Sequence, residues 1–236
     1  MTAHYLVAFL IIIFAAAFSV ITHKLNTIAA ITGAVVAVSI FLGAGYIGIA
    51  MLAAFFILGS AATSWKMNTK LQLGNAEKNK GQRTAGQVLA NGGIAAITGL
   101  LALIISSEEN LFRVMIAASL ASATADTLSS ELGTVYGKKF YNILTFKKDA
   151  RGLDGVISVE GIIIGIIGSA LIALIYSSGF GWSKNFAWII IAGTIGNIAD
   201  SILGALFERK NYLSNNAVNF LNTLIAAFVI FLLMKL

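Results

Sequence analysis

Two carboxylates stand in a stretch of this sequence that is otherwise small and apolar. The segment "RVMIAASLASATADTLSSELG" reaches Asp126 after a run of apolar residues, and Glu131 follows within two helical turns. A carboxylate at membrane depth costs about 3 kcal/mol or more, so it is by default a candidate functional residue. In a helix, Ser119, Ser122 and Asp126 share one face, which predicts a polar stripe leading to the acid.

A later apolar stretch repeats this arrangement. The segment "GTIGNIADSILGALFE" places Asp200 two helical turns before Glu208. Small residues on a membrane helix allow another backbone or a ligand to approach closely. The Ala-Asp-Ser/Thr pattern around Asp126 and Asp200 is a faint internal repeat, which suggests duplicated helix pairs. Five small or polar residues lie on or beside the stripe of the second acid: Gly193, Gly196, Asn197, Ser201 and Gly204.

Amide and hydroxyl side chains mark the beginnings of two other apolar stretches, "GQVLANGGIAAIT" and "SNNAVNFLNT". Each set follows helical spacing and occupies one face: Gln87, Asn91 and Thr98 in the first, and Asn215, Asn219 and Asn222 in the second. Four apolar stretches are thus polar at the same end. This bias predicts a shared water-filled pocket that opens to one side of a membrane. Its deep acids are expected to be Asp126, Glu131 and Asp200, with Glu160 as a fourth candidate.

These residue types favour a site for magnesium and phosphate. The chain has no cysteine and only two histidines, so its metal ligands would be carboxylate oxygens, which suit Mg²⁺. Loop lysines bind phosphate as point charges, and loop glycines let backbone amides approach it. The predicted metal and catalytic residues are Asp126, Glu131 and Asp200. The predicted substrate and nucleotide contacts are Asn91, Lys138, Lys139, Lys147, Lys148, Gly152, Gly155, Glu160, Asn197, Ser201, Asn215, Asn216 and Asn219.

Each of these residues also has a purely structural interpretation. Asp126 could be a hydrogen-bonded structural acid, and Glu131, nearer the surface, could simply be solvated. Glu160 could form an ion pair with Arg151 or Lys148. The asparagine stripes could hold helices together, and the loop lysines could serve only to orient the chain and contact lipid headgroups.

Membrane-spanning helices must position these residues. Hydrophobic residues make up 58% of the 236 residues and charged residues only 11%, whereas soluble domains average about 25% charged. The sequence therefore predicts an all-α, polytopic transmembrane helical bundle that forms a single domain over 1–236. Apolar stretches long enough to cross a bilayer of about 30 Å are expected at about 5–22, 27–43, 45–64, 88–106, 112–132, 157–177, 186–207 and 216–235.

The basic residues predict the orientation of the bundle. Thirteen of the sixteen Lys and Arg residues fall in loops on one side, which include the long hydrophilic loops 66–86 and 134–155. Because cytoplasmic loops carry the excess of basic residues, the pocket should open to the cytoplasm, with both termini outside. The net charge of +6 is spread over separate loops and does not favour nucleic-acid binding. The first apolar run could also be a signal peptide, but no Lys or Arg precedes it.

At these residues the chain resembles a widespread integral membrane family that includes the phytyl-phosphate kinase of plant and cyanobacterial vitamin E synthesis. The segments "ATADTLSSELG", "GLDGVISVEG", "GTIGNIADSILGA" and "NNAVNFL" carry the resemblance, with "GQVLANGG" as a weaker fifth segment. Polyprenol kinases and lipid cytidylyltransferases are similar more distantly. The chain departs from the family pattern at Val156, where the family tends to have glycine, and it lacks the prolines expected just before that segment.

The resemblance implies a kinase that transfers a phosphoryl group from CTP or another nucleoside triphosphate to a prenyl monophosphate such as phytyl or geranylgeranyl phosphate. It implies a phosphate-binding role for "GLDGVISVEG" and so adds Asp154 and Ser158 to the candidate site. Mg²⁺ is the expected cofactor; the bilayer, the prenyl phosphate and the nucleotide are the expected partners.

Two alternative functions remain open from the sequence. Paired acids in membrane helices also describe ion-coupled transporters, although apolar outer halves such as "LLALII" argue against a path through the membrane. A lipid cytidylyltransferase would share the metal and the nucleotide but would make a CDP-lipid.

Overall fold

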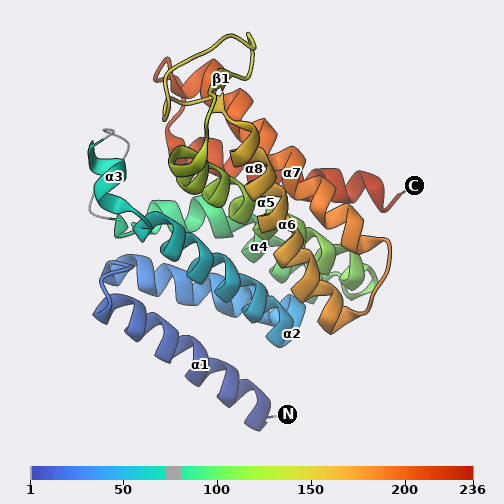
Figure 1. Cartoon of the computed structure of the whole chain (residues 1–236). Helices are drawn as coiled ribbons and strands as arrows, with labels where there is room; N and C mark the ends of the chain where they lie inside the picture. Colours follow the sequence, from blue (N-terminus) through green and yellow to red (C-terminus); the bar gives the residue numbers. More distant parts are fainter. Residues whose placement is uncertain (1, 73–80, 236) are drawn as a thin grey trace.

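The computed structural model describes residues 2–72 and 81–235, and these residues form a bundle of long helices with almost no sheet (Figure 1). The prediction of an all-α transmembrane bundle is confirmed. The α-helices are α1 (Thr2–Ile21), α2 (Thr27–Ser64), α3 (Met67–Gln72), α4 (Ala85–Ile104), α5 (Glu109–Tyr136), α6 (Val159–Phe180), α7 (Asn185–Leu203) and α8 (Asn215–Leu233). Shorter elements are a 3₁₀ turn (η2, Ser106–Glu108), a π turn (η3, Gly204–Glu208), and two strands, β1 (Tyr141–Asn142) and β2 (Val156–Ile157).

Helix α2 is a hairpin of two arms. Its 38 residues would extend about 57 Å if straight, nearly twice the thickness of a bilayer core. The backbone leaves the helical region at Gly45, which has φ +59°. The Lys24 ammonium donates to Ser64 Oγ at 2.8 Å, so the chain just before α2 and the end of α2 lie at the same end of the bundle. In the described residues seven helices are long and apolar enough to cross a membrane, and the two arms of α2 account for the predicted second and third spans.

Helix α5 forms the centre of the bundle, and the other long helices except α1 pack around it (Figure 1). All residues of α5 from Ala117 to Ala125 are buried and all but Leu120 are small, which lets five neighbouring helices pack closely around it. The glycine stripe of α7 faces α5 directly. A Cβ atom on Gly196 would lie 2.1 Å from Ser122 Oγ, and one on Gly193 would lie 2.9 Å from Ala121 Cβ. The stripe predicted for close approach therefore brings α7 against the backbone of α5.

Side-chain caps start three of the helices that reach the polar end of the bundle. Thr84 begins α4 with a capping box, and Ser158 and Ser214 accept hydrogen bonds from the backbone of the first turns of α6 and α8. Such caps satisfy amides that would otherwise lack partners at a helix start. The asparagines that follow on α4 and α8 are thereby placed within the first turns.

The predicted separation of basic residues agrees with the arrangement of the described loops. Arg83 and Lys24 pair through their backbones, and Lys70 contacts Glu131 near the end of α5, so these basic loops meet at one end. Arg113 donates to the carbonyl oxygen of Gly43 at the opposite end. Lys78 and Lys80 lie outside the described residues. Which end faces the cytoplasm stays a prediction.

Candidate active site

A cavity of about 230 Å³ opens at the polar end of the bundle, between α5, α6, α7 and the loop that joins α5 to α6. Its floor and walls are mainly polar, and the predicted stripes of α5 and α7 both reach it. From the other two predicted stripes only Asn215 lines it, and no residue of the α4 stripe does. Ten predicted site residues line it: Asp126, Glu131, Gly152, Asp154, Gly155, Ser158, Asn197, Asp200, Ser201 and Asn215.

The two acids of the repeated motif meet in this cavity. The carboxyl groups of Asp126 on α5 and Asp200 on α7 lie within hydrogen-bonding reach of each other. Asn222 of α8 donates to Asp200 Oδ1 at 2.7 Å, and Ser122 of α5 donates to Asn222 Oδ1 at 3.0 Å. Asn222 and Ser122 are completely buried, so this relay fixes Asp200 relative to three helices.

Glu131 lines the same cavity but has a partner of its own. The Lys70 ammonium donates to Glu131 Oε2 at 2.5 Å and to the carbonyl oxygens of Ala62 and Thr63 at 2.9 and 2.8 Å. Only 1% of Lys70 is exposed, and these three bonds use all three of its protons. Glu131 is therefore neither simply solvated nor a free carboxylate, because an ion pair anchors it to the end of α2.

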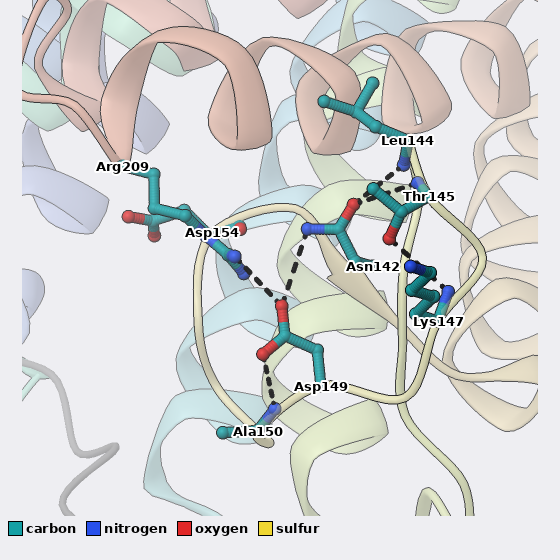
Figure 2. Close-up of polar contacts among 8 residues, drawn as sticks. All are labelled: Asn142, Leu144, Thr145, Lys147, Asp149, Ala150, Asp154 and Arg209. Carbon is teal, nitrogen blue, oxygen red and sulfur yellow. Dashed lines mark hydrogen bonds and ion pairs between the residues drawn. The ribbon is translucent and has the colours of Figure 1, made fainter.

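The loop 137–158 covers one side of the cavity and is clamped by Arg209 (Figure 2). Arg209 donates through Nη1 to Asp149 Oδ2 and through Nε to the carbonyl oxygen of Asp154, both at 2.9 Å. Asp149 Oδ1 accepts from the Ala150 amide, and Asp149 Oδ2 also accepts from Asn142. The Ala150 amide and then the Arg209 guanidinium hold the pKa of Asp149 below its ordinary value. Strands β1 and β2 pair within the same loop.

Asp154 and Glu208 stand at the rim of the cavity. Asp154 belongs to the clamped loop, and Glu208 ends η3. Partial burial raises the pKa of Asp154 above its ordinary value, and the charge of Arg209 opposes that shift. Carboxyl groups therefore continue from the floor of the cavity to its mouth.

Gly155 brings the loop against the end of α7. It has φ +72°, and a Cβ atom there would lie 2.3 Å from Ala205 Cβ. We expect Gly155→Ala to displace the loop and to destabilise the protein by about 1–3 kcal/mol, because the collision adds to backbone strain. Faster hydrogen exchange of residues 137–158 would show the displacement.

Gly181→Ala is the matched control for this prediction. Gly181 also has positive φ, at +92°, but an added Cβ would meet nothing within 4 Å. Its substitution tests backbone strain without collision. If both variants lost the same stability, collision with Ala205 would not contribute to the effect of Gly155→Ala.

Eight predicted contacts lie outside the cavity lining. The loop lysines point into solvent on the exposed face of the 137–158 loop, and Lys147 sits in the turn that Asn142 and Thr145 organise (Figure 2). Glu160 accepts from the backbone amide of Lys138. The residues concerned are Asn91, Lys138, Lys139, Lys147, Lys148, Glu160, Asn216 and Asn219.

The described residues hold no group of three or more acids or histidines arranged for one metal ion. Asp126 and Asp200 form a pair, whereas Glu131 is engaged by Lys70. A pair of carboxylates nevertheless fits Mg²⁺, which is commonly held by one or two carboxylates together with water and substrate phosphates. The oxygen-only donor set excludes ions that require thiolate ligands.

The residues of this site that were not predicted include Asn222, Glu208 and Lys70. Asn222 lies on the same helical face as Asn215 and Asn219, so its spacing was a usable signal. Glu208 follows the Asp200 stripe by two turns. Lys70 had no local signal, because its partner Glu131 lies 61 residues later in the chain.

Comparison with known proteins identifies the family. The sequence matches the family described as "Integral membrane protein DUF92" over residues 10–227. The chain belongs to the DUF92 family. This confirms the resemblance seen in the motifs and the multi-pass membrane character of the chain. No solved structure matches it.

Several relatives resemble this DUF92 member over most of its length. It is 33% identical over 198 residues to "Protein VTE6, chloroplastic" of Arabidopsis thaliana, which covers 81% of this chain and 60% of VTE6. The chain thus spans less than two thirds of VTE6. It is 36% identical to an uncharacterized membrane protein of Methanocaldococcus jannaschii, covering 78% of this chain and 75% of the relative. An uncharacterized membrane protein of Synechocystis is 33% identical, with 82% and 76% covered.

Proposed function

We propose that this protein is a membrane-embedded kinase that transfers a phosphoryl group from a nucleoside triphosphate to a prenyl monophosphate, with Mg²⁺ as cofactor. The observation that carries the proposal is the meeting of Asp126 and Asp200 in one polar cavity at the end of an apolar bundle. The motif resemblance and the similarity to VTE6 support the same reaction class. The cavity opens to the cytoplasm in this proposal, and both termini lie outside.

The size of the cavity indicates which part of each substrate enters it. At about 230 Å³ it is smaller than the roughly 300–1,000 Å³ typical of pockets for whole small ligands. Phosphate groups fit this space, whereas the prenyl chain would lie between helices in the bilayer. The nucleoside would lie near the 137–158 loop, where Lys138, Lys139, Lys147 and Lys148 supply positive charge from outside the cavity.

The proposed reaction forms one phosphorus–oxygen bond and breaks another. An oxygen of the prenyl phosphate attacks the terminal phosphorus of the nucleotide, and the bond from that phosphorus to the bridging oxygen breaks. The products are a prenyl diphosphate and a nucleoside diphosphate. Mg²⁺, when bound by Asp126 and Asp200, supplies neutralisation of phosphate charge. The chain itself supplies positioning, which is the main requirement of phosphoryl transfer.

Asn222 fixes the position of the Asp200 carboxylate beside Asp126, as binding of Mg²⁺ requires. The Asn222 amide donates to Asp200 Oδ1 only, so Asp200 Oδ2 does not contact Asn222. The hydrogen bond from Ser122 to Asn222 connects α8 to α5. Asn197 and Ser201 add polar groups on the α7 wall. In this proposal these polar groups contact the reacting phosphate, and the apolar helices shield the prenyl tail from water.

Purified protein in nanodiscs tests the proposal directly. Incubation with Mg²⁺, phytyl or geranylgeranyl phosphate, and a panel of nucleoside triphosphates should yield the prenyl diphosphate and a nucleoside diphosphate. Mass spectrometry of both products measures the reaction. A CDP-lipid with release of pyrophosphate would establish a cytidylyltransferase instead. Absence of turnover across all nucleotides and chain lengths would refute the proposed kinase.

A further inference from the structure

The charges around the cavity do not balance. Five of the residues that line it are carboxylates, and within the described part of the chain no Lys or Arg side chain joins them. Two acids near the cavity have basic partners: Lys70 neutralises Glu131, and Arg209 neutralises Asp149 in the loop. Four lining carboxylates are left without an ion-pair partner among the described residues: Asp126, Asp154, Asp200 and Glu208.

These four carboxylates form an inner pair and an outer pair. Asp126 and Asp200 interact directly on the floor of the cavity. Asp154 and Glu208 lie together at the rim: a Cβ atom on Gly204 would lie 3.5 Å from Asp154 Cβ, and Glu208 ends the η3 turn that Gly204 begins. Neither pair is joined by a third acid or a histidine in the part of the chain that the structure describes. Each pair is therefore an incomplete set of oxygen ligands.

One amide in the cavity lining also lacks a protein partner among the described residues. Asn197 is only 5% exposed, yet its side chain lines the cavity and forms no hydrogen bond with another described residue. A Cβ atom on Gly165 would lie 2.6 Å from Asn197 Nδ2, so this amide is held tightly against α6. The polar atoms of the Asn197 amide are not sealed off from the cavity, so a ligand or its water can complete their hydrogen bonds.

We propose that the cavity binds two divalent cations, one at Asp126 and Asp200 and a second at Asp154 and Glu208, with phosphate groups bridging them beside Asn197. The reason is electrostatic. When all four carboxylates are ionised they repel phosphate, and one divalent cation balances only half of their charge. Two cations balance all four, and each takes its remaining oxygen ligands from phosphate and water, as Mg²⁺ usually does. This inference rests on the proposed phosphate-transfer function and deepens it.

Cation counting tests the inference without requiring turnover. The number of bound Mn²⁺ ions, which replace Mg²⁺, is measured by electron paramagnetic resonance. The full chain is held in nanodiscs of zwitterionic lipid. In the presence of inorganic pyrophosphate, the parent protein should bind two Mn²⁺ ions per chain. Saturation at a single Mn²⁺ per chain, with pyrophosphate bound, would overturn the proposal.

Variants at the rim assign the second ion. Asp154→Asn and Glu208→Gln should each weaken the second Mn²⁺ by about tenfold or more and leave the first in place, because ligand charge sets cation affinity. Glu108→Gln is the matched control, since it removes an exposed acid from the opposite end of the bundle. Two equally tight ions in the Asp154→Asn/Glu208→Gln double variant would place the second ion elsewhere and refute the assignment.

The outcomes for the cations and for the kinase are separable. Two Mn²⁺ ions bound by a protein that turns over no prenyl phosphate would support the two-cation cavity and refute the kinase. Turnover by a protein that binds a single Mn²⁺ would support the kinase and refute the second cation.

Discussion

Replacing Asp126 with asparagine is expected to reduce turnover by about a hundredfold or more while the protein still folds and inserts. The substitution keeps the volume of the side chain but removes the charge that attracts Mg²⁺. Asp126 lies beside Asp200, so loss of one negative charge also relieves repulsion between them. The variant should therefore be as stable as the parent protein or more stable. Product formation and thermal unfolding in the same nanodiscs measure the two effects.

The double variant sharpens this prediction. Asp200→Asn should lose a similar amount of activity, and Asp126→Asn combined with Asp200→Asn should be little worse than either alone, because ligands of one ion act as a unit. Asn222→Asp is the variant for comparison: it changes the charge of a side chain beside Asp200 and keeps the size of that side chain. Near-parental turnover of Asp126→Asn together with a lower melting temperature would show that Asp126 holds helices together and does not bind metal.

Lys70→Met is expected to be among the most destabilising single substitutions in this chain. It would leave the Glu131 carboxylate, 14% exposed, without its cation and the carbonyl oxygens of Ala62 and Thr63 without a donor. Breaking a buried ion pair from one side costs about 3–5 kcal/mol. Denaturation in detergent should show this loss. Lys210→Met is the matched control, because Lys210 is an exposed lysine in the turn that follows η3.

The partner substitution separates the pair from the metal site. Glu131→Gln added to Lys70→Met removes the unpaired charge and should restore much of the lost stability. Glu131→Gln alone should weaken Mn²⁺ binding far less than Asp126→Asn, since Lys70 already engages that carboxylate. Equal loss of Mn²⁺ binding in both variants would return Glu131 to the ligand set that the sequence predicted.

The class of fold and the polar end of the bundle followed from the sequence alone. A bilayer requires long apolar helices, so the length and composition of the apolar stretches predicted the bundle. Helical periodicity predicted that Asp126 and Asp200 stand on polar stripes with small residues. The boundary between the expected spans 27–43 and 45–64 coincides with the reversal that the structure places at Gly45. Each of these features depends on residues close together in the chain, which is why a local pattern was sufficient.

The partners of the polar side chains were decided by the tertiary structure. Ser122 meets Asn222 across 100 residues, and Lys70 meets Glu131 across 61. Spacing within a helix says which face a residue occupies but not which helix lies opposite. The close packing of glycines between α5 and α7 selects those neighbours, and the burial of Lys70 then requires an acid within reach. The loop lysines face solvent because the clamp at Arg209 and the pairing of β1 with β2 orient the loop, and both are contacts that no local sequence pattern specifies.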